Sequence, residues 1–492
     1  MAALVRVCQL GSQSLWIDEV FSLRSAHLGS PLHVADLVED VHGPLYSAIL
    51  HLTGALWAPS EWTLRLPSAI FGVALVPVMA VLARSWVGRE AVVPAAWITA
   101  LSPFLVWYSQ EARNYMLLIL VTALSAVAML RLRERPSPGR GAAWLAAAWA
   151  GLLSNFSFAL VLPLHLGWWW TAPVPPRRRL AGAALGAAAL LVLISPWILH
   201  ALRIWDFQRL RPAATVATAP LRGATTFHPV AIPFALHAFT VGYSLGPGLR
   251  ELRSAPPMRA LARHAGEIAA VAVVFGALLL LGLAALRRRG RLAEALVWLG
   301  LPILVLSYFA ARNFKVFNPR YLAVCMPAIV LVLAAAFADL RRRWAVAFAL
   351  AVAALWGVSL AHHFLVPAYG KEDYRDAAAL LRERGRPGER VIALGAADPV
   401  FYYYRGPLVA RALWLGYAAN PTRLEAKLAE ALGGASGAWL VLSRAEDLDP
   451  QDAFAAWVGR RFPEAGRFGF EGVRVWHLDR EAVGRLEAPA AP

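Results

Sequence analysis

The sequence predicts a polytopic α-helical membrane protein that ends in a small α/β domain. Of its 492 residues, 59% are hydrophobic and only 16% are charged, whereas soluble domains carry roughly 45–50% apolar and about 25% charged residues. Apolar runs of about 20 residues, the length that crosses a bilayer, recur along the chain. After Pro367 short strand-like and helix-like patterns replace these runs. An ordinary soluble enzyme is therefore excluded.

Ten apolar segments between residues 62 and 366 are candidate membrane spans. They cover residues 62–83, 91–108, 112–131, 141–154, 156–172, 180–200, 266–286, 293–311, 320–338 and 344–364. After every second span comes a compact arginine cluster, at 84–89, 131–140, 177–179, 287–291 and 341–343. Short basic loops stay on the cytoplasmic side of a membrane. The alternation therefore predicts about ten spans and places the remaining connections outside.

The outer-face segments then include residues 1–61, the loop 201–265 and everything after 366. Residues 42–59 are apolar, but counting them as a span would invert every later arginine cluster, so we expect a helix along the outer interface. Residues 1–13 are too short to cross a bilayer although the following segment must be outside. We therefore expect a first span that precedes the given sequence.

Residues 367–492 are predicted to form an extracytoplasmic α/β domain. Strand-like runs at 389–394, 438–443 and 473–478 alternate with helix-like runs at 374–384, 421–432 and 450–462. This tail has 17 basic and 17 acidic residues, so the net charge of +17 lies entirely in the first 366 residues. A basic membrane body with a neutral tail favours phosphates or anionic lipid headgroups as partners and argues against nucleic acid.

Acidic side chains gather at the predicted outer ends of helices instead of lying within spans. Asp18 and Glu19 are adjacent in SLWIDEVFSLR, beside the apolar residues Trp16 and Phe21. Partial removal from water raises the pKa of a carboxylate toward that of a useful general base. A solvated acid pair at the interface is the alternative, and the spacing does not decide between the two.

A second polar cluster falls where one predicted span ends and the next begins. In SPFLVWYSQEARNYML, Glu111 and Arg113 occupy a connection too short for an ordinary solvated loop. Arg113 could bind a phosphate or pair with Glu111, and structural pairing is the simpler interpretation.

A third set of residues is basic or hydroxylic and faces outward. It comprises His42 in VHGPLY, Arg65 in RLPSA, and Arg320 with Tyr321 in NPRYL. Arginine binds phosphate through two parallel hydrogen bonds. His42 could instead be a turn residue, and Arg65 could extend toward the interface from a span end. Arg320 is the better candidate for an anionic partner, because Arg312 and Lys315 make its outer loop basic.

WIDE followed by FSLR, then HGPLY, RLPSAIFG, SPFLVWYSQEARNYML and NPRYL resemble, in this order, the bacterial branch of the protein O-mannosyltransferase and aminoarabinose-transferase superfamily. These are family-39-like glycosyltransferases of the GT-C fold. The resemblance is specific over 14–131, thinner over 141–311, and returns at 312–330. Residues 371–392 also resemble the periplasmic domain of many members.

The resemblance implies transfer of a sugar from a polyprenyl-phosphate donor to a lipid, glycan or protein acceptor at the outer face of the cytoplasmic membrane. It implies Asp18 as the catalytic base, Glu19 as its acidic neighbour and Glu111 as the second acidic position. His42, Arg320 and Tyr321 would lie near the donor phosphate, with Arg65 and Arg113 as further candidates. Gly43 stands where proline is common in the family.

No cofactor is assigned with certainty. Asp18, Glu19 and Glu111 could hold a hard divalent cation through oxygen ligands, but no His/Cys spacing indicates a dedicated site, so a metal-free mechanism is expected. A lipid-linked-saccharide transporter and a non-catalytic membrane assembly protein are the alternatives. A coupled transporter would keep charges within its spans, and no acidic residue lies mid-span here. The enzyme interpretation requires the Asp18 and Glu111 segments to meet on the outer side.

Overall fold

The computed structural model describes residues 1–26, 43–204, 227, 230–254, 257–312, 317–413, 421–445, 449 and 452–487. The chain divides into two compact units. The first comprises Met1–Leu10, Ser22–Leu245 and Gly266–Leu360. The second comprises Gly11–Phe21, Gly246–Ala265 and Ala361–Pro492, so the tail domain includes two short segments from earlier in the chain.

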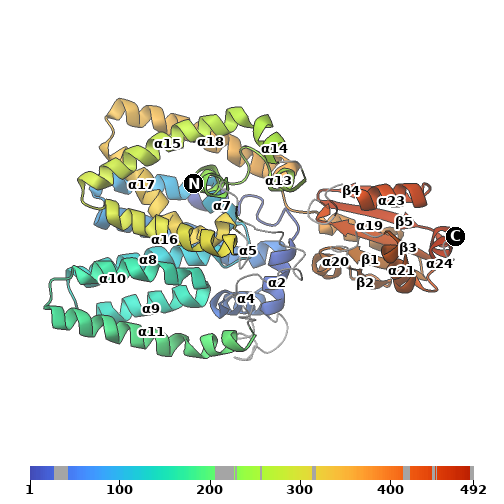
Figure 1. Ribbon diagram of the computed structural model, residues 1–492, viewed down its shortest axis with the longest axis horizontal. Coiled ribbons are helices and arrows are strands. Elements are labelled where there is room, and N and C mark those ends of the chain that lie inside the picture. The colour runs from blue at the N-terminus through green and yellow to red at the C-terminus, as the bar shows by residue number, and fades with distance from the viewer. Residues whose placement is uncertain are drawn as a thin grey trace. The chain divides into compact units, whose positions relative to one another are not determined.

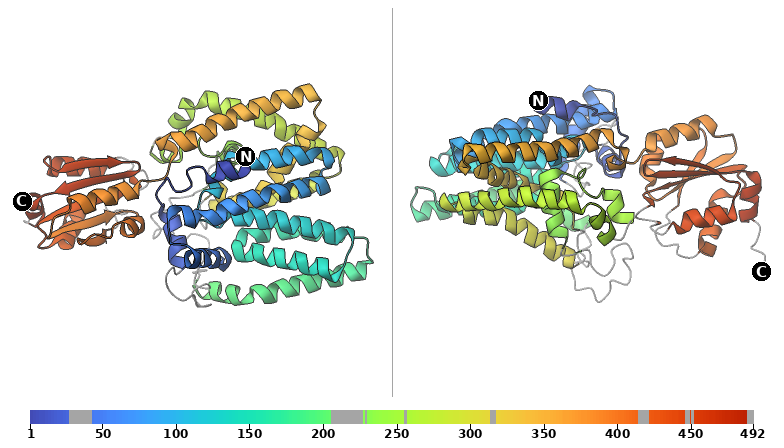
Figure 2. Two further views of the ribbon diagram at one scale, coloured as in Figure 1. Left: turned by 180° about the vertical axis from the view of Figure 1, so that it is seen from behind. Right: turned by 90° about the horizontal axis from the view of Figure 1, so that it is seen from above.

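The first unit is built from helices that run alongside one another (Figures 1 and 2). They are α1 (Ala2–Val7), α4 (Pro44–Leu56), α5 (Glu61–Trp86), α6 (Val92–Leu101), α7 (Pro103–Ser109), α8 (Tyr115–Glu134), α9 (Pro138–Ser154), α10 (Leu162–Trp170), α11 (Pro176–Ile204), α12 (Ala231–Val241), α15 (Ala265–Arg288), α16 (Leu292–Ala311), α17 (Met326–Asp339) and α18 (Arg342–Leu365). The 3-10 turns η1 (Arg89–Ala91), η2 (Phe156–Val161) and η5 (Pro319–Cys325) precede α6, α10 and α17.

Within the described residues, seven helices are long and apolar enough to cross a membrane. An eighth span results if Arg89–Leu101 and Pro103–Ser109, which are bent by 52°, count as one. The predicted spans 141–154 and 156–172 correspond to α9 and to the apolar helix Phe156–Trp170, both shorter than 18 residues. Helix α4 has 13 residues, about 20 Å at 1.5 Å per residue, which is less than the hydrocarbon core. The chain is a multi-pass membrane protein.

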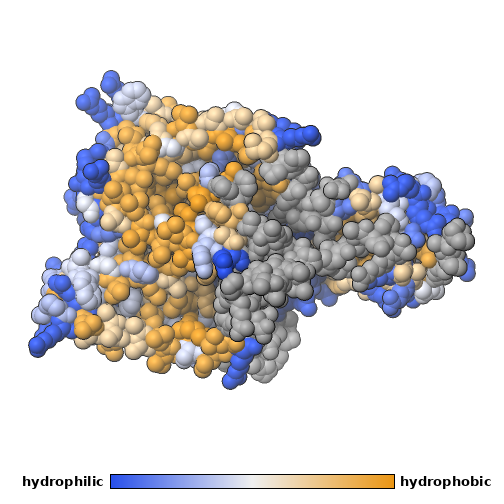
Figure 3. Space-filling model, in the orientation of Figure 1, coloured by the Kyte–Doolittle hydropathy of each residue, from blue (hydrophilic) through white to orange (hydrophobic). Residues whose placement is uncertain are grey.

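The surface of the helical unit has the polarity that a bilayer requires. Large apolar side chains are exposed on its helices, among them Leu185, Val273, Leu304 and Leu350, and Figure 3 shows a broad hydrophobic surface on one face of this unit. The connections α8–α9, α10–α11 and α15–α16, which carry three of the arginine clusters, lie at the same end of the helices (Figure 1). The helices therefore present apolar flanks to lipid and charged turns to water.

The second unit contains a five-stranded mixed sheet with the order β2-β1-β3-β5-β4. Strand β1 (Glu389–Leu394) is parallel to β2 (Val409–Leu413) and β3 (Gly437–Ser443), and β5 (Val473–Leu478) is antiparallel to β3 and β4 (Gly466–Phe470). Helices α19 (Tyr374–Arg384) and α20 (Ala397–Tyr403) pack on one face. The other face is covered by α21 (Pro421–Leu432), α23 (Ala453–Arg461) and α24 (Arg480–Glu487). The predicted α/β tail domain is confirmed.

The two cysteines are free thiols in contrasting environments. Cys8 follows α1 and is exposed, whereas Cys325 at the end of η5 is buried, with its Sγ 3.7 Å from the carbonyl oxygen of Trp298.

Buried Glu389 joins three elements of the tail domain. Its carboxylate accepts hydrogen bonds from Trp439 Nε1 at 2.7 Å, His477 Nε2 at 2.8 Å and the backbone N–H of Arg386 at 2.9 Å. Burial acts to raise the pKa of Glu389, but these hydrogen bonds outweigh it, so the pKa lies below its ordinary value. A depressed carboxyl pKa stabilises the fold above the unfolded value of about 4.3 and ceases to do so as pH falls through the folded value.

We therefore expect Glu389→Gln to destabilise the tail domain by about 1–2 kcal/mol at pH 7 and by progressively less below about pH 4. Hydrogen exchange of the β1 and β3 peptides measures this stability in the intact protein. Exposed Glu383→Gln in α19 is the control and should leave exchange unchanged. An effect of Glu389→Gln that is independent of pH would contradict the electrostatic explanation.

Gly43 lies where α4 begins against the end of α9. A Cβ atom at this position would sit 2.1 Å from the carbonyl oxygen of Leu153 and 2.5 Å from its carbonyl carbon. The backbone of Leu153 cannot move aside as a flexible side chain could, so only the hydrogen atom of a glycine fits at this position. Gly43 thus permits the close packing of α4 against the end of α9.

Gly43→Ala should lower stability by about 1–3 kcal/mol, the usual cost of overpacking. The thermal unfolding midpoint in detergent is the measurement. Gly276→Ala in α15 is the matched control, since nothing lies within 4 Å of its added methyl group, and it should be neutral or slightly stabilising. Equal midpoints for the two variants would refute the close approach at Gly43.

Candidate active site

The polar segment 102–114 begins at a break in a membrane helix. Pro103 has no N–H, so the carbonyl of Thr99 loses its normal helical partner four residues later, and the bend also frees the carbonyl of Ala100. Arg6, completely buried, donates to the carbonyl of Thr99 at 2.8 Å and to that of Ala100 at 2.7 Å. Its Nε also donates to Ser109 Oγ at 3.1 Å. The Arg6 guanidinium thus contacts the helix on both sides of the break, at Thr99 and Ala100 before it and at Ser109 after it.

The elbow between α7 and α8 holds the second acidic motif in a buried position. Glu111 is 3% exposed and accepts a hydrogen bond from Trp107 Nε1 at 2.9 Å. Arg113, also buried, donates from Nη1 to Ser22 Oγ at 2.9 Å. Ser22 lies in the FSLR part of the first motif, on helix α2 (Ile17–Ser25). Burial of both charged groups confirms that this connection is not an ordinary solvated loop.

Hydrogen bonds connect three of the motifs that the sequence singles out. Tyr46 of HGPLY bonds through its hydroxyl to Ser68 Oγ of RLPSA at 2.8 Å. Ser68 in turn donates to the backbone carbonyl of Arg113 at 3.3 Å. Residues separated by up to 67 positions thus form one buried chain of contacts, and the elbow is fixed from the side of α4 and α5.

Arg320 and Tyr321 of NPRYL come to the same region from the far part of the chain. The Arg320 guanidinium carbon lies 5.9 Å from the ring centroid of Tyr115 and 5.2 Å from that of Tyr321. Its Nη2 donates to the Tyr321 hydroxyl at 3.2 Å. Arg113 lies on the same Tyr115 ring, at 5.8 Å. Two arginines therefore share one aromatic ring, an arrangement that collects positive charge beside Glu111.

Two further tyrosines line this cluster. The hydroxyls of Tyr108 and Tyr243 are 2.8 Å apart and buried, and the Tyr108 ring packs edge-on against Tyr115. The charges of Glu111 and Arg320 both act on the paired hydroxyls, which places all four groups within electrostatic reach of one another. We call Glu111, Arg113, Tyr108, Tyr115, Tyr243, Arg320 and Tyr321 the tyrosine–arginine cluster.

Arg65 is oriented toward the protein backbone. It is 2% exposed and donates from Nη1 to the carbonyl of Leu10 at 3.0 Å. This contact satisfies part of its buried guanidinium near the start of α5, and a role at the donor phosphate stays a prediction.

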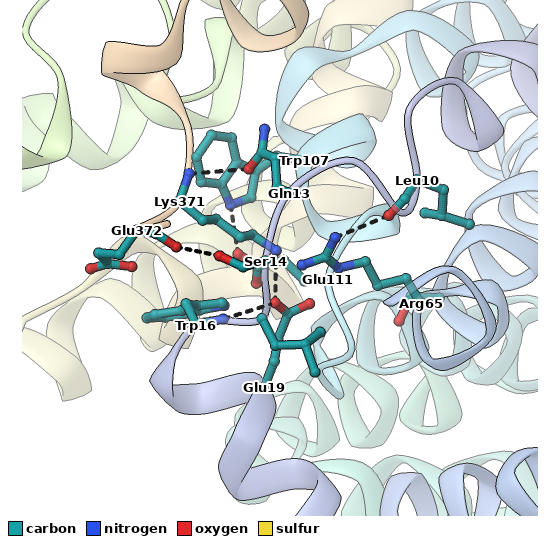
Figure 4. Close-up of polar contacts among 12 residues, drawn as sticks. Leu10, Gln13, Ser14, Trp16, Glu19, Arg65, Trp107, Glu111, Lys371 and Glu372 are labelled. Carbon is teal, nitrogen blue, oxygen red and sulfur yellow. Dashed lines mark hydrogen bonds and ion pairs between the residues drawn. The ribbon is translucent and has the colours of Figure 1, made fainter. Parts of the chain in front are cut away.

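Asp18 and Glu19 of the first acidic motif lie in the second unit. Glu19 is completely buried and pairs with Lys371 Nζ at 3.1 Å, while the backbone N–H of Trp16 donates to the same carboxylate oxygen at 3.3 Å (Figure 4). Asp18, its neighbour on the first turn of α2, is half-buried. The two carboxylates thus differ: Glu19 is enclosed, and Asp18 is the more accessible.

Apart from Arg65, the candidate residues fall into three groups. Glu111, Arg113, Arg320 and Tyr321 come together in the tyrosine–arginine cluster. Asp18 and Glu19 lie in the other unit, and their meeting with Glu111 stays a prediction. His42 lies outside the described residues, as does Lys315. Where the chain is described, no three His, Cys, Asp or Glu side chains gather closely enough to hold a metal ion.

Sequence reasoning missed Arg6, Lys371, Tyr108 and Tyr243. Lys371 is the first residue of KEDYRD, part of the tail segment that resembles the family, and Tyr108 lies within the YSQEARNY motif. The sequence near both residues could therefore have identified them as candidates. Arg6 and Tyr243 lie in stretches without a recognised motif, and only the fold places them against the elbow.

Comparison with known proteins agrees with this architecture. Residues 41–200 match the family described as dolichyl-phosphate-mannose-protein mannosyltransferase. No curated protein sequence matches the chain.

Solved structures share the fold over nearly the whole chain. ArnT from Cupriavidus metallidurans in the apo state is 18% identical, with a TM-score of 0.59 over 99% of this chain and 97% of ArnT. ArnT bound to undecaprenyl phosphate is 19% identical, with a TM-score of 0.56 over 99% and 98% of the two chains. The oligosaccharyltransferase AglB from Archaeoglobus fulgidus, in complex with an inhibitory peptide and a dolichol-phosphate, is 14% identical, with a TM-score of 0.50 over 89% and 68%.

At these identities the structures establish the fold, and the family match is limited to residues 41–200. The chain thus has the fold of ArnT and AglB, and its residues 41–200 are similar to the dolichyl-phosphate-mannose-protein mannosyltransferase family.

Proposed function

We propose that the protein transfers a sugar from a polyprenyl-phosphate donor to an acceptor at the outer face of the cytoplasmic membrane. The observation that carries the proposal is the position of Arg320 over Tyr115, two residues 205 positions apart that meet beside the buried elbow of Glu111. A guanidinium and tyrosine hydroxyls are strong donors to phosphate oxygens. ArnT, whose fold this chain shares, binds undecaprenyl phosphate.

In the proposed reaction Asp18 accepts the proton of the acceptor nucleophile as it attacks the anomeric carbon. The bond from that carbon to the donor phosphate oxygen breaks, and the polyprenyl phosphate leaves with its electron pair, so the anomeric configuration inverts. The half-buried state of Asp18 supports this role, because a base must reach both substrate and protein. Glu111 would orient the acceptor, and Arg320 with Tyr321 would bind the phosphate of donor and product.

The outer face is favoured by the arginine-rich connections that share one end of the helices, since such turns face the cytoplasm. The motif residues belong to the opposite predicted face. The acceptor remains one of three classes, a lipid, a glycan or a protein. Incubation of membranes with a panel of radiolabelled polyprenyl-phosphate sugars identifies both the sugar and the product class that gains label.

Asp18→Asn should lower transfer about 10²- to 10⁴-fold, the usual contribution of a general base, with little change in the amount of folded protein. Turnover under saturating donor is the measurement. Asp398→Asn changes another half-buried aspartate, on α20, and serves as the matched control with wild-type turnover. Near wild-type turnover in Asp18→Asn would exclude Asp18 as the base.

Arg320→Gln should raise the KM for the polyprenyl-phosphate sugar roughly 10- to 100-fold, because one or two charged hydrogen bonds to phosphate are lost. Arg320→Lys keeps the charge but not the planar fork, and we expect an intermediate KM. Initial rates over a donor series measure both. A normal donor KM in folded Arg320→Gln would place the phosphate elsewhere.

A further inference from the structure

The segment that carries Asp18 and Glu19 is held by the beginning of the tail domain. Ser14 Oγ donates to the carbonyl of Glu372 at 2.5 Å and accepts the N–H of Tyr374 at 3.2 Å. The N–H of Lys371 donates to Gln13 Oε1 at 3.1 Å. Arg375 donates to the backbone carbonyls of residues 11 and 12, and the Tyr403 hydroxyl accepts the N–H of Leu15 at 2.6 Å.

One contact in this set joins two charges. The Lys371 ammonium is 9% exposed and the Glu19 carboxylate is fully buried, at a separation of 3.1 Å. A buried charge without a partner is strongly unfavourable, so removal of either member leaves the other in a costly state. The pair therefore fixes the side chain of Glu19 more firmly than the surrounding neutral contacts can.

The direction of Asp18 follows from this contact. Consecutive residues on an α-helix project about 100° apart, and Asp18 and Glu19 are consecutive in the first turn of α2. With Glu19 held on Lys371, rotation of this turn is restricted, and Asp18 projects to one side of it, where it is half-buried.

We infer that Lys371, through its ion pair with Glu19, is a positioning residue that holds the Asp18 carboxylate in its working direction. This role rests on the proposed function of Asp18 as the base. The role assigned to Lys371 is a positioning role and not a catalytic one. The tail domain thus contributes directly to the organisation of the first acidic motif.

The primary test measures the kcat of sugar transfer and the donor KM for the Lys371→Met variant. We expect kcat to fall about 10- to 100-fold, as for a base displaced by about 1 Å, with the donor KM within twofold of wild type. Lys371→Arg restores the cation and should recover most of kcat. The matched control is Arg474→Met, which removes the cation of the exposed Arg474–Asp452 pair in the same unit and should have wild-type kcat.

A second measurement is independent of turnover. Dicyclohexylcarbodiimide modifies protonated carboxyl groups in apolar surroundings, and peptide mass spectrometry resolves Glu19 from Asp18. Without the ammonium, protonated Glu19 persists to higher pH, so half-maximal labelling should move up by about one unit or more in Lys371→Met and stay in place in Lys371→Arg. The other titratable or charged groups in these contacting segments are Asp18, Glu372, Asp373, Tyr374 and Arg375, with Tyr403 from α20, and all of them are kept in the variants.

The two readouts separate the inference from the function on which it rests. If wild-type protein transfers no sugar from any donor, the proposed function fails, and labelling alone still decides whether Lys371 governs Glu19. Wild-type kcat in Lys371→Met, or an unmoved labelling profile, overturns the positioning role. A fall in kcat that Lys371→Arg does not recover overturns it as well. Lys371→Gln replaces Lys371→Met if the latter does not accumulate in membranes.

Discussion

A broken membrane helix must find partners for the carbonyl groups that it frees, because the hydrocarbon core offers no water. The break between α6 and α7 meets this requirement with the single guanidinium of Arg6, which contacts Thr99, Ala100 and Ser109. The elbow that follows can therefore leave the direction of the span and carry Glu111 and Arg113 in a buried, ordered position. The tyrosine–arginine cluster depends on this arrangement.

The same requirement applies to the buried charged groups in each unit. Glu111 has Trp107, Arg113 has Ser22, Arg65 has the carbonyl of Leu10, and Glu19 has Lys371. Buried polar groups with partners of this kind are rigid and limited to one geometry. Several motif residues thus stabilise one another in the folded protein.

The sequence predicts the parts of this fold that follow from hydropathy and misses those that depend on partners far along the chain. Every predicted span has a helical counterpart, although Pro103 breaks one and α9 is short. The inner strands β1, β3 and β5 are predictable because most of their residues are apolar and buried. Edge strands β2 and β4 are not, because both are partly exposed and β4 contains two glycines. Nothing local to Arg6 indicates that it will cap a helix 93 residues away.

The environments of the two thiols have a practical consequence. Cys325 is enclosed at the end of η5, whereas Cys8 is open to solvent two positions beyond Arg6. A maleimide dye should therefore attach at one place in the native chain without any engineering. The fluorescence of the dye would report movement of the segment around Arg6, whose guanidinium binds the carbonyl groups at the helix break.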